Sequence, residues 1–306
     1  MKRVLVTGLS GFIGRHTIPF LLKRGFEVHG VILESEPEPA IQNVYWHKAN
    51  LLNQKQIAPL LEKTTPSHLL HLAWVTAHGA YWASPENLRW LQNSIELISS
   101  FNASGGKRIV VAGTCAEYDW QHKYCIENRT PLTPATLYGV SKNALYDILM
   151  AYAQQENLSA AWGRVFFLYG PYENPIRLVP SVINALLNQQ PAPCSHGNQV
   201  RDFLHVEDVA SAFVTLLDSD IKDAVNIASG KPATLKEIIY QIAEKIGHPD
   251  LIQLGAFPAS KSEPSLLVAD VERLTRDLGW VPRHNLDTGL DQTIAWWKEQ
   301  NQQKTQ

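Results

Sequence analysis

Cysteine is scarce in this chain, and the few cysteines form no pattern. Cys115, Cys125 and Cys194 are the only three among 306 residues, and they lie at irregular spacings. An odd, scattered set supports neither a disulfide framework nor a zinc site built on paired cysteines. We therefore expect free thiols, a reducing compartment such as the cytoplasm, and no bound metal.

Long apolar runs and blocks of like charge are also missing. No stretch approaches the roughly 20 apolar residues that span a bilayer, and the formal net charge is only −2. Lys2 and Arg3 could open a signal peptide, but the glycines and hydroxyl residues from Thr7 to Gly11 interrupt its apolar core. Without a basic block, the chain lacks the positive surface of a nucleic-acid binder. We expect neither a membrane nor a nucleic acid as a partner.

What is present is an alternation of β-rich and helical segments. The composition, 45% apolar and 18% charged, is that of a folded protein. We predict strands over 2–7, 26–33, 43–49, 67–73, 107–112, 159–166 and 223–227. We predict helices over 14–24, 54–63, 86–104, 138–156, 177–190, 206–218, 234–247 and 287–300. This alternation predicts an α/β fold, a Rossmann-type doubly wound parallel sheet with ligands at the carboxyl ends of its strands.

The pattern changes after residue 170. Prolines at 171, 175, 180, 191 and 193 and shorter apolar segments indicate a second, smaller region. We predict a dinucleotide-binding Rossmann domain over residues 1–170, to which 200–230 returns. Residues 171–199 and 231–306 would then form a smaller C-terminal substrate-binding domain over the ligand edge of the sheet.

A glycine-rich turn directly follows the first predicted strand. Gly8, Gly11 and Gly14 stand in the run TGLSGFIG, between a β-rich stretch and an amphipathic helix. Glycines let the backbone turn tightly against a pyrophosphate, and the helix N-terminus presents free N–H groups and a partial positive charge. The turn therefore predicts a dinucleotide cofactor, NADP(H) or NAD(H).

The residues that would choose between these two cofactors leave the choice open. An acidic residue at the end of the second strand favours NAD, whereas an arginine favours NADP. Here the strand ends in Ile32 and Leu33, and Glu34 comes late. Arg15 could reach a 2′-phosphate or be a solvated helix residue. Asn50 could bind the adenine edge or shape a turn.

A tyrosine and a lysine four residues apart predict acid–base chemistry. The spacing places Tyr138 and Lys142 on one face of a helix. There the ammonium would lower the phenol pKa from about 10. Such a tyrosine can exchange a proton with a carbinol oxygen while a hydride moves. Thr114, after the fifth predicted strand, can hydrogen-bond the same oxygen.

Together these motifs resemble the extended short-chain dehydrogenase/reductase family, and more narrowly its NAD(P)-dependent nucleotide-sugar epimerase/dehydratase branch. The resemblance rests on the glycine turn, Thr114 with Tyr118, Tyr138-x-x-x-Lys142, and RDFLHVEDV over 201–209. Further matches are Leu72-Ala73, Asn93, RVFFLYGP over 164–171, NIASG over 226–230 and LGWVP over 278–282. The resemblance covers nearly the whole chain.

The resemblance implies a role for each matching residue. Tyr138 would be the general acid/base, Lys142 would lower its pKa and hold the nicotinamide ribose, and Thr114 would orient the substrate carbonyl. Arg201 would hold the diphosphate of a sugar nucleotide, with a salt bridge to Asp202 as its alternative, and Asp208 would cap the following helix. The implied cofactor-binding residues are Gly8, Ser10, Gly11, Phe12, Ile13, Gly14, Arg15, Asn50, Leu51, Leu72, Ala73, Trp74, Asn93, Tyr138, Lys142 and Phe166. The implied substrate-binding residues are Thr76, His78, Cys115, Ala116, Asn174, Arg177 and Arg201.

Departures from the family pattern narrow the reaction. The 4,6-dehydratases of this branch place Asp-Glu after the strand threonine, but this chain has Cys115 and Ala116 there. Glu117 would point to the other side of an extended segment. The stretch GTCAEYDW over 113–120 is more similar to reductases of deoxysugar biosynthesis. Our main prediction is therefore NAD(P)H-dependent reduction of a nucleotide-linked 4-keto-6-deoxy sugar to its 4-hydroxy product.

Two alternatives stay open. An NAD-dependent nucleotide-sugar 4-epimerase would use the same catalytic residues, although the missing acid at Ile32 weakens that interpretation. A dinucleotide-binding sensor without turnover is the other, and the intact catalytic set counts against it.

The resemblance to the family also implies a homodimer through the helices at 86–104 and 138–156. In the loop after the fourth strand, aromatic rings suit a sugar pocket, although we expect Trp82 and Trp90 to pack beneath that loop.

Overall fold

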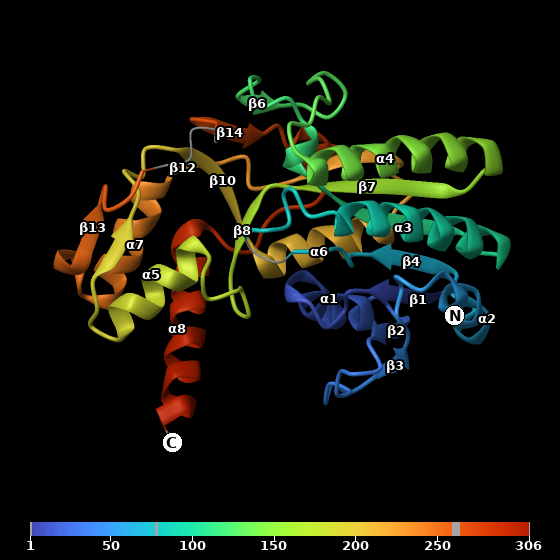
Figure 1. Cartoon of the computed structure of the whole chain (residues 1–306), viewed down its shortest axis with the longest axis horizontal. Helices are drawn as coiled ribbons and strands as arrows, with labels where there is room; N and C mark the ends of the chain where they lie inside the picture. The colour runs from blue at the N-terminus through green and yellow to red at the C-terminus, as the bar shows by residue number, and fades with distance from the viewer. Residues whose placement is uncertain (1, 77–78, 259–263, 306) are drawn as a thin grey trace.

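A computed structural model describes residues 2–76, 79–258 and 264–305 of the chain (Figure 1). Its main sheet has seven parallel strands in the order β11-β7-β5-β4-β1-β2-β3. They are β1 (Lys2–Thr7), β2 (Phe26–Ile32), β3 (Val44–Lys48), β4 (His68–His71), β5 (Arg108–Thr114), β7 (Ser159–Val165) and β11 (Asp223–Ile227). The chain winds outward from β1 in both directions, so the strand order reverses between β1 and β4. The predicted Rossmann-type fold is confirmed.

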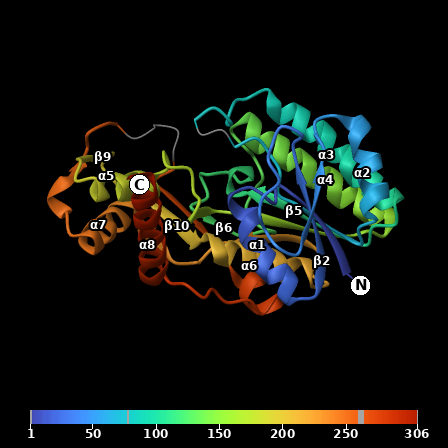
Figure 2. The same ribbon diagram turned by 90° about the horizontal axis from the view of Figure 1, so that it is seen from below.

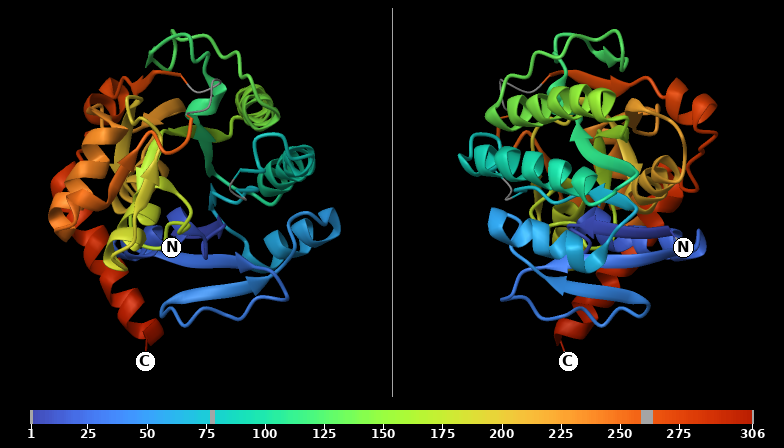
Figure 3. Two further views of the ribbon diagram at one scale, coloured as in Figure 1. Left: turned by 60° about the vertical axis from the view of Figure 1, so that its left-hand side comes forward. Right: turned by 90° about the vertical axis from the view of Figure 1, so that its right-hand side faces the viewer.

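Helices cover both faces of this sheet (Figure 3). One face carries α2 (Ile57–Thr64), α3 (Glu86–Ala103) and α4 (Leu137–Glu156), and the other carries α1 (Phe12–Lys23) and α6 (Val206–Leu217). The central strands are apolar on both sides because both sides are covered. In β1, Val4 and Val6 join the core beneath α1 and α6, whereas Leu5 joins the core beneath α2 and α3.

A smaller lobe lies beside the carboxyl edge of the sheet (Figure 1). Its core is formed mainly by α5 (Leu178–Leu187), α7 (Leu235–Ile246) and α8 (Leu286–Thr305). The remaining strands are β6 (Tyr124–Cys125), β8 (Phe167–Tyr169), β9 (Ala192–Cys194), β10 (Val200–His205), β12 (Pro232–Thr234), β13 (Ile252–Leu254) and β14 (Leu266–Ala269). Short helical turns are η1 (Gln54–Gln56), η2 (Cys115–Glu117), η3 (Pro249–Leu251) and η4 (Arg273–Asp277). Seen from below, α8 lies at the side of this lobe that faces α6 and α1 (Figure 2).

The segment 200–230 contributes to both parts of the molecule. α6 packs on the large sheet and β11 is its edge strand, whereas β10 pairs with β8, β12 and β14. The domain boundaries derived from the sequence stay a prediction. At the end of the described residues, α8 continues to Thr305. Within the described ranges, no helix is long and apolar enough to cross a membrane.

Candidate active site

The glycine turn sits where the strand order reverses, and its glycines are required by close packing. Gly8 has φ +71°, and a Cβ there would lie 2.9 Å from the Ala73 nitrogen. A Cβ on Gly14 would lie 2.1 Å from the Gly8 oxygen. No larger residue fits either position, so the turn lies tightly between β1, β4 and α1.

The start of α1 is suited to an anion. Its N-cap, Gly11, makes no side-chain capping hydrogen bond, and the first turn carries no acidic residue. The first N–H groups, including those of Phe12 and Ile13 beside Ser10, are therefore not taken by a capping side chain and lie at the positive end of the helix. This cradle fits the pyrophosphate of a dinucleotide.

Strand β4 ends against the same turn. The Thr7 carbonyl and hydroxyl accept hydrogen bonds from Leu72 N and Ala73 N, both at 3.2 Å. Trp74 follows, and its ring nitrogen donates to the Asn87 side chain at 2.8 Å. Leu72 and Ala73 thus lie beside the glycine turn and Trp74 follows them, and their predicted role in binding the cofactor stays a prediction.

Arg15 and Asn50 are both engaged within the chain. The Arg15 guanidinium donates to the carbonyls of Ser10 at 2.6 Å and Gly11 at 3.3 Å, and it lies 4.1 Å from the Tyr172 ring centre. Arg15 therefore braces the glycine turn against the smaller lobe rather than extending into solvent. The Asn50 amide oxygen accepts from Leu52 N at 3.0 Å, which is a turn-shaping role, and Leu51 beside it is buried.

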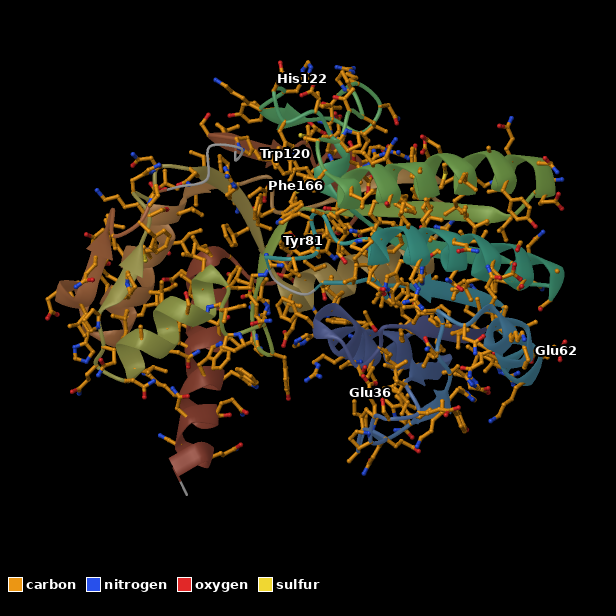
Figure 4. All side chains as sticks on the ribbon, viewed as in Figure 1. Glu36, Glu62, Tyr81, Trp120, His122 and Phe166 are labelled. Atoms are coloured by element: carbon orange, nitrogen blue, oxygen red, sulfur yellow. The ribbon has the colours of Figure 1, made fainter. Side chains whose placement is uncertain are left out.

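An acidic side chain does stand at the end of β2, although the sequence analysis missed it. Glu36 accepts a hydrogen bond from Leu33 N at 3.3 Å, so its carboxylate folds back to the position where we looked for an acid at Ile32. Figure 4 shows Glu36 at the edge of the molecule near the loop between β2 and β3. Only the folded loop brings it there, and no sequence spacing would have indicated it.

Thr114 and Tyr138 meet at the carboxyl end of β5. Thr114 ends that strand and caps η2, and its hydroxyl accepts from Ala116 N at 3.2 Å. Tyr138 lies in the first turn of α4, a helix capped by Thr136. Burial raises the pKa of Tyr138, and its contact with the Thr114 hydroxyl opposes that rise. The structure thus brings these two predicted catalytic groups together.

Lys142 lies one turn deeper on α4 and is almost fully buried. Its ammonium donates to the Ala112 carbonyl at 2.9 Å and sits 3.8 Å from the centre of the Trp74 ring. Burial lowers the pKa of Lys142 to about 7, and the Glu117 carboxylate opposes this effect. We expected this ammonium to depress the phenol pKa of Tyr138. That prediction is wrong for the chain without a bound ligand. Burial has the largest effect on the pKa of Tyr138, and it raises this pKa.

We expected Glu117 on the other side of an extended segment, but residues 115–117 form the 3-10 turn η2. One carboxylate oxygen of Glu117 accepts a hydrogen bond from Thr114 N at 2.8 Å, so Glu117 stays close to the predicted catalytic groups. Its carboxylate bonds Arg164 Nε at 2.6 Å and Trp162 Nε1 at 3.0 Å, and both members of the ion pair are fully buried. Cys115 and Ala116 are also buried, and burial raises the pKa of the Cys115 thiol. No carboxylate therefore occupies the positions from which a dehydratase of this branch expels water.

Aromatic rings surround the exposed side of Tyr138. Tyr81 and Trp82 meet its ring edge-on at 5.0 and 5.7 Å, and Trp120 meets Trp82 at 6.0 Å. We expected Trp82 only to pack beneath the loop, but it borders the acid/base. Figure 4 shows Tyr81, Phe166 and Trp120 where the two lobes meet. Rings with polar edges suit the face of a sugar.

Arg177 continues this aromatic wall from the smaller lobe. Its guanidinium lies 5.8 Å from the centre of the Tyr81 ring. Glu173 is buried nearby, where burial raises its pKa to about 8 and Arg177 opposes the rise. The sequence analysis did not single out Glu173, because nothing in its local pattern shows that it is buried.

The remaining predicted residues are spread more widely. Asn93 is buried in α3 and donates to Arg89 O, the exposed Asn174 accepts from Ile176 N, and Phe166 is buried beside Tyr118. Thr76 is exposed on the loop after β4, and His78 lies outside the described residues.

Comparison with known proteins decides the family. The model of the NAD dependent epimerase/dehydratase family matches residues 4–228 of the chain. The protein belongs to this family. The resemblance derived from its motifs is thereby confirmed.

Several curated members of the family align with this chain over almost its whole length. UDP-glucuronate 4-epimerase from Thermodesulfobacterium geofontis is 26% identical, with 98% of this chain and 97% of the relative covered. UDP-glucose 4-epimerase from Halalkalibacterium halodurans is 24% identical, covering 97% and 96%. A solved structure of MoeE5 in complex with UDP-glucuronic acid and NAD is 30% identical, covers 97% of this chain and 99% of its own, and has a TM-score of 0.86.

The RDFLHVEDV segment, one of the motifs on which the family resemblance rests, begins with two buried charged residues, Arg201 and Asp202. Arg201 is buried, donates to Val200 O at 3.0 Å and lies 5.2 Å from the Phe167 ring centre. The Asp202 carboxylate accepts hydrogen bonds from Ser229 and from the nitrogens of Gly230 and Ala269. It therefore joins β10 to the segments that follow β11 and form β14.

Asp208 does not cap α6, which corrects our prediction. Its two carboxylate oxygens accept from Arg283 N at 2.8 Å and His284 N at 2.9 Å. His205 is the N-cap residue of α6 instead. Asp208 thus fixes the segment that leads into α8.

Proposed function

We propose that this enzyme is an NAD-dependent 4-epimerase of UDP-linked sugars. The observation that carries the proposal is the meeting of Thr114 and Tyr138 above the buried Lys142, with Cys115 and Ala116 where a dehydratase would have acids. The relatives named above support the epimerase, our alternative, better than the 4-keto-sugar reductase that we predicted first.

The proposed chemistry needs one proton carrier that works in both directions. NAD in the glycine-turn crevice would supply the hydride acceptor and donor. Tyr138 would take the proton of the sugar 4-hydroxyl during oxidation and return one to the 4-keto oxygen during reduction. Thr114 would hydrogen-bond this oxygen and hold it near the phenol.

Lys142 would contribute as a positively charged group at the cofactor. With a pKa of about 7 it gains and loses its proton near neutral pH. Protonated Lys142 can donate to ribose hydroxyls while it stays bound to Ala112 O.

Within this proposal, we favour a UDP-uronic acid as the substrate because of the position of Arg177. The guanidinium lies across Tyr81 from the acid/base, within the aromatic wall. An arginine in such a place can bind the sugar carboxylate in bidentate fashion. MoeE5 has been solved in complex with UDP-glucuronic acid and NAD and also with UDP-glucose and NAD, so the Arg177 guanidinium is the observation that favours the uronic acid here.

The first experiment asks what the purified enzyme carries and converts. Denaturation should release NAD, and the native enzyme should equilibrate UDP-glucuronate with UDP-galacturonate without added cofactor. Net consumption of NADPH or NADH with a 4-keto-sugar nucleotide would instead restore the reductase. Release of CO2 would indicate a decarboxylase, and tight NAD binding with no turnover would indicate a sensor.

The second experiment separates the two kinds of sugar. Arg177→Gln should raise KM for UDP-glucuronate by about tenfold or more, because a charged hydrogen bond contributes about 1.5–3 kcal/mol. KM for UDP-glucose should change little. Equal effects on both sugars would contradict the uronate assignment while leaving the epimerase proposal intact.

We also propose that two copies pair through α3 and α4. Leu88 is 53% exposed on α3, and Val140 and Ile148 are 47% and 40% exposed on α4. Apolar side chains on two adjacent helices suit a symmetric helical contact. Leu88→Glu combined with Ile148→Glu should convert a dimer into a monomer in light-scattering measurements, and a monomeric wild type would refute the proposal.

A further inference from the structure

A second group of chemistry-bearing side chains lies at the joint between the two lobes, apart from Tyr138. His205 ends β10, Glu207 lies in the first turn of α6, and His284 lies in the segment before α8. One ligand atom from each of these residues lies within 4.8 Å of the others. Residues far apart in sequence are thus brought to one point by the fold.

His205 is the unusual member of this group. It is 1% exposed, and neither ring nitrogen has a hydrogen-bond partner among the described residues. Buried imidazoles ordinarily bond through both nitrogens, so this one requires a partner. His205 and His284 border a cavity of about 60 Å³, which has room for a water molecule or a small ion.

The other two side chains are held in place by neighbours. His284 Nε2 lies 3.2 Å from one Glu207 oxygen, and Gln292 of α8 donates to the other Glu207 oxygen at 2.8 Å. Asp208 accepts from the His284 backbone nitrogen at 2.9 Å. Contacts of this kind orient the ligands around metal ions.

We propose that His205, Glu207 and His284 bind one Zn²⁺ ion that fastens the smaller lobe to α6. Two imidazoles and a carboxylate form a set that zinc accepts, whereas magnesium and calcium prefer oxygen ligands alone. The 3.2 Å between His284 Nε2 and Glu207 Oε2 matches two corners of a zinc tetrahedron with bonds of about 2.0–2.1 Å. Small rotations of His205 close the third corner, and water takes the fourth.

This proposal revises our expectation that the chain binds no metal, which rested on its cysteines. Histidine and glutamate at 205, 207 and 284 share no metal-binding spacing in the sequence, so only the fold assembles them. The site is independent of the proposed epimerase, because none of its three residues belongs to the catalytic set.

The test is a Co²⁺ titration of the full-length chain without a polyhistidine tag, after removal of metals by a chelator. Wild type should bind one Co²⁺ per chain with the strong visible absorption of a four- or five-coordinate ion, and Zn²⁺ should displace it. Zn²⁺ should also raise the thermal midpoint. His284→Gln and Glu207→Gln should each weaken binding by about 100-fold or more.

A matched control is the exposed His122 on the loop near β6 (Figure 4). His122→Gln should bind Co²⁺ as tightly as wild type. His284 is only half-buried, so its variant should fold even where a His205 variant does not, and far-UV circular dichroism checks this. No absorption band and no thermal shift in wild type, or equal binding by His284→Gln, would overturn the proposal.

Discussion

Two buried cations, Arg164 and Lys142, are both influenced by the Glu117 carboxylate, but their surroundings differ. Arg164 is paired with Glu117 at 2.6 Å and also touches Tyr118. The Lys142 ammonium donates to a carbonyl at 2.9 Å and lies over the Trp74 ring, and no carboxylate of the described residues is bonded to it. The charge of Arg164 is neutralised by a bonded carboxylate, whereas the charge of Lys142 would be available to the cofactor that we propose. The difference separates a structural charge from a functional one.

The largest expected effect concerns the functional side of this comparison. Tyr138→Phe should reduce kcat by about 10²–10⁴-fold, because it removes the group that transfers the proton. Tyr124→Phe, at an exposed tyrosine on β6, is the matched control and should retain activity. Product assays with UDP-glucuronate measure both variants. Full turnover by Tyr138→Phe would remove this residue from the mechanism.

Changes to the buried Arg164–Glu117 ion pair should lower the stability of the folded chain. Glu117→Gln leaves the Arg164 charge buried without its partner, which should lower the free energy of unfolding by about 3–5 kcal/mol. Glu62→Gln, on the outer surface of α2 (Figure 4), should change it by less than about 0.5 kcal/mol. Urea denaturation measures both. Equal small changes would mean that the Arg164–Glu117 pair contributes little.

Lys142→Met should move stability in the opposite direction while abolishing turnover. The wild-type chain keeps an ammonium in a site that disfavours charge, so the variant should gain about 1–2 kcal/mol at pH 7. The Lys142 side chain has a pKa of 10.5 in the unfolded chain and of about 7 in the folded chain, so between these pH values only the unfolded chain keeps the proton. Wild-type stability should therefore rise between pH 7 and 10.5 relative to that of Lys142→Met. Parallel stability curves over this range would show that burial does not lower the pKa of Lys142.

The smallest effect tests the ring beneath the ammonium. Trp74→Leu removes a cation–π contact of about 0.5–2 kcal/mol, so it should lower the pKa of Lys142 further. The alkaline limb of the kcat/KM profile should shift down by up to about one pH unit, and Trp74→Phe, which keeps a ring, should shift it less. An unmoved limb would show that Lys142 does not control it.

The strands and helices of the large sheet could be predicted because buried apolar segments such as Val4–Val6 and Ile109–Val111 alternate along the chain with helical segments. The sheet that contains β10, β12 and β14 could not, since several of its strands have only three or four residues and their pairing is set by distant segments. Among site residues, the glycine turn and Thr114, Tyr138 and Lys142 could be located, because helix and strand geometry fixes their positions. The contacts that each of these side chains makes could not be predicted.

Lys142 and Arg15 show why. The four-residue spacing placed Lys142 beneath Tyr138, but burial and the Glu117 carboxylate, both set by tertiary packing, determine its pKa. Arg15 follows the glycine turn as predicted, yet its partner Tyr172 comes from the other lobe. Glu36 reaches the end of β2 only through the fold of its loop.

The seam between α1 and the smaller lobe has a consequence for how long a cofactor stays bound. Arg15 stacks on Tyr172, and His16 bonds the Pro171 carbonyl at 3.1 Å, directly behind the turn that cradles the pyrophosphate. The start of α1 and the segment that follows β8 are thus joined by these two contacts. An epimerase must return the hydride to the sugar it came from before the dinucleotide escapes. In the epimerase that we propose, these two contacts would help to retain the dinucleotide, because releasing it from the glycine turn would disturb the packing of α1 against Pro171 and Tyr172.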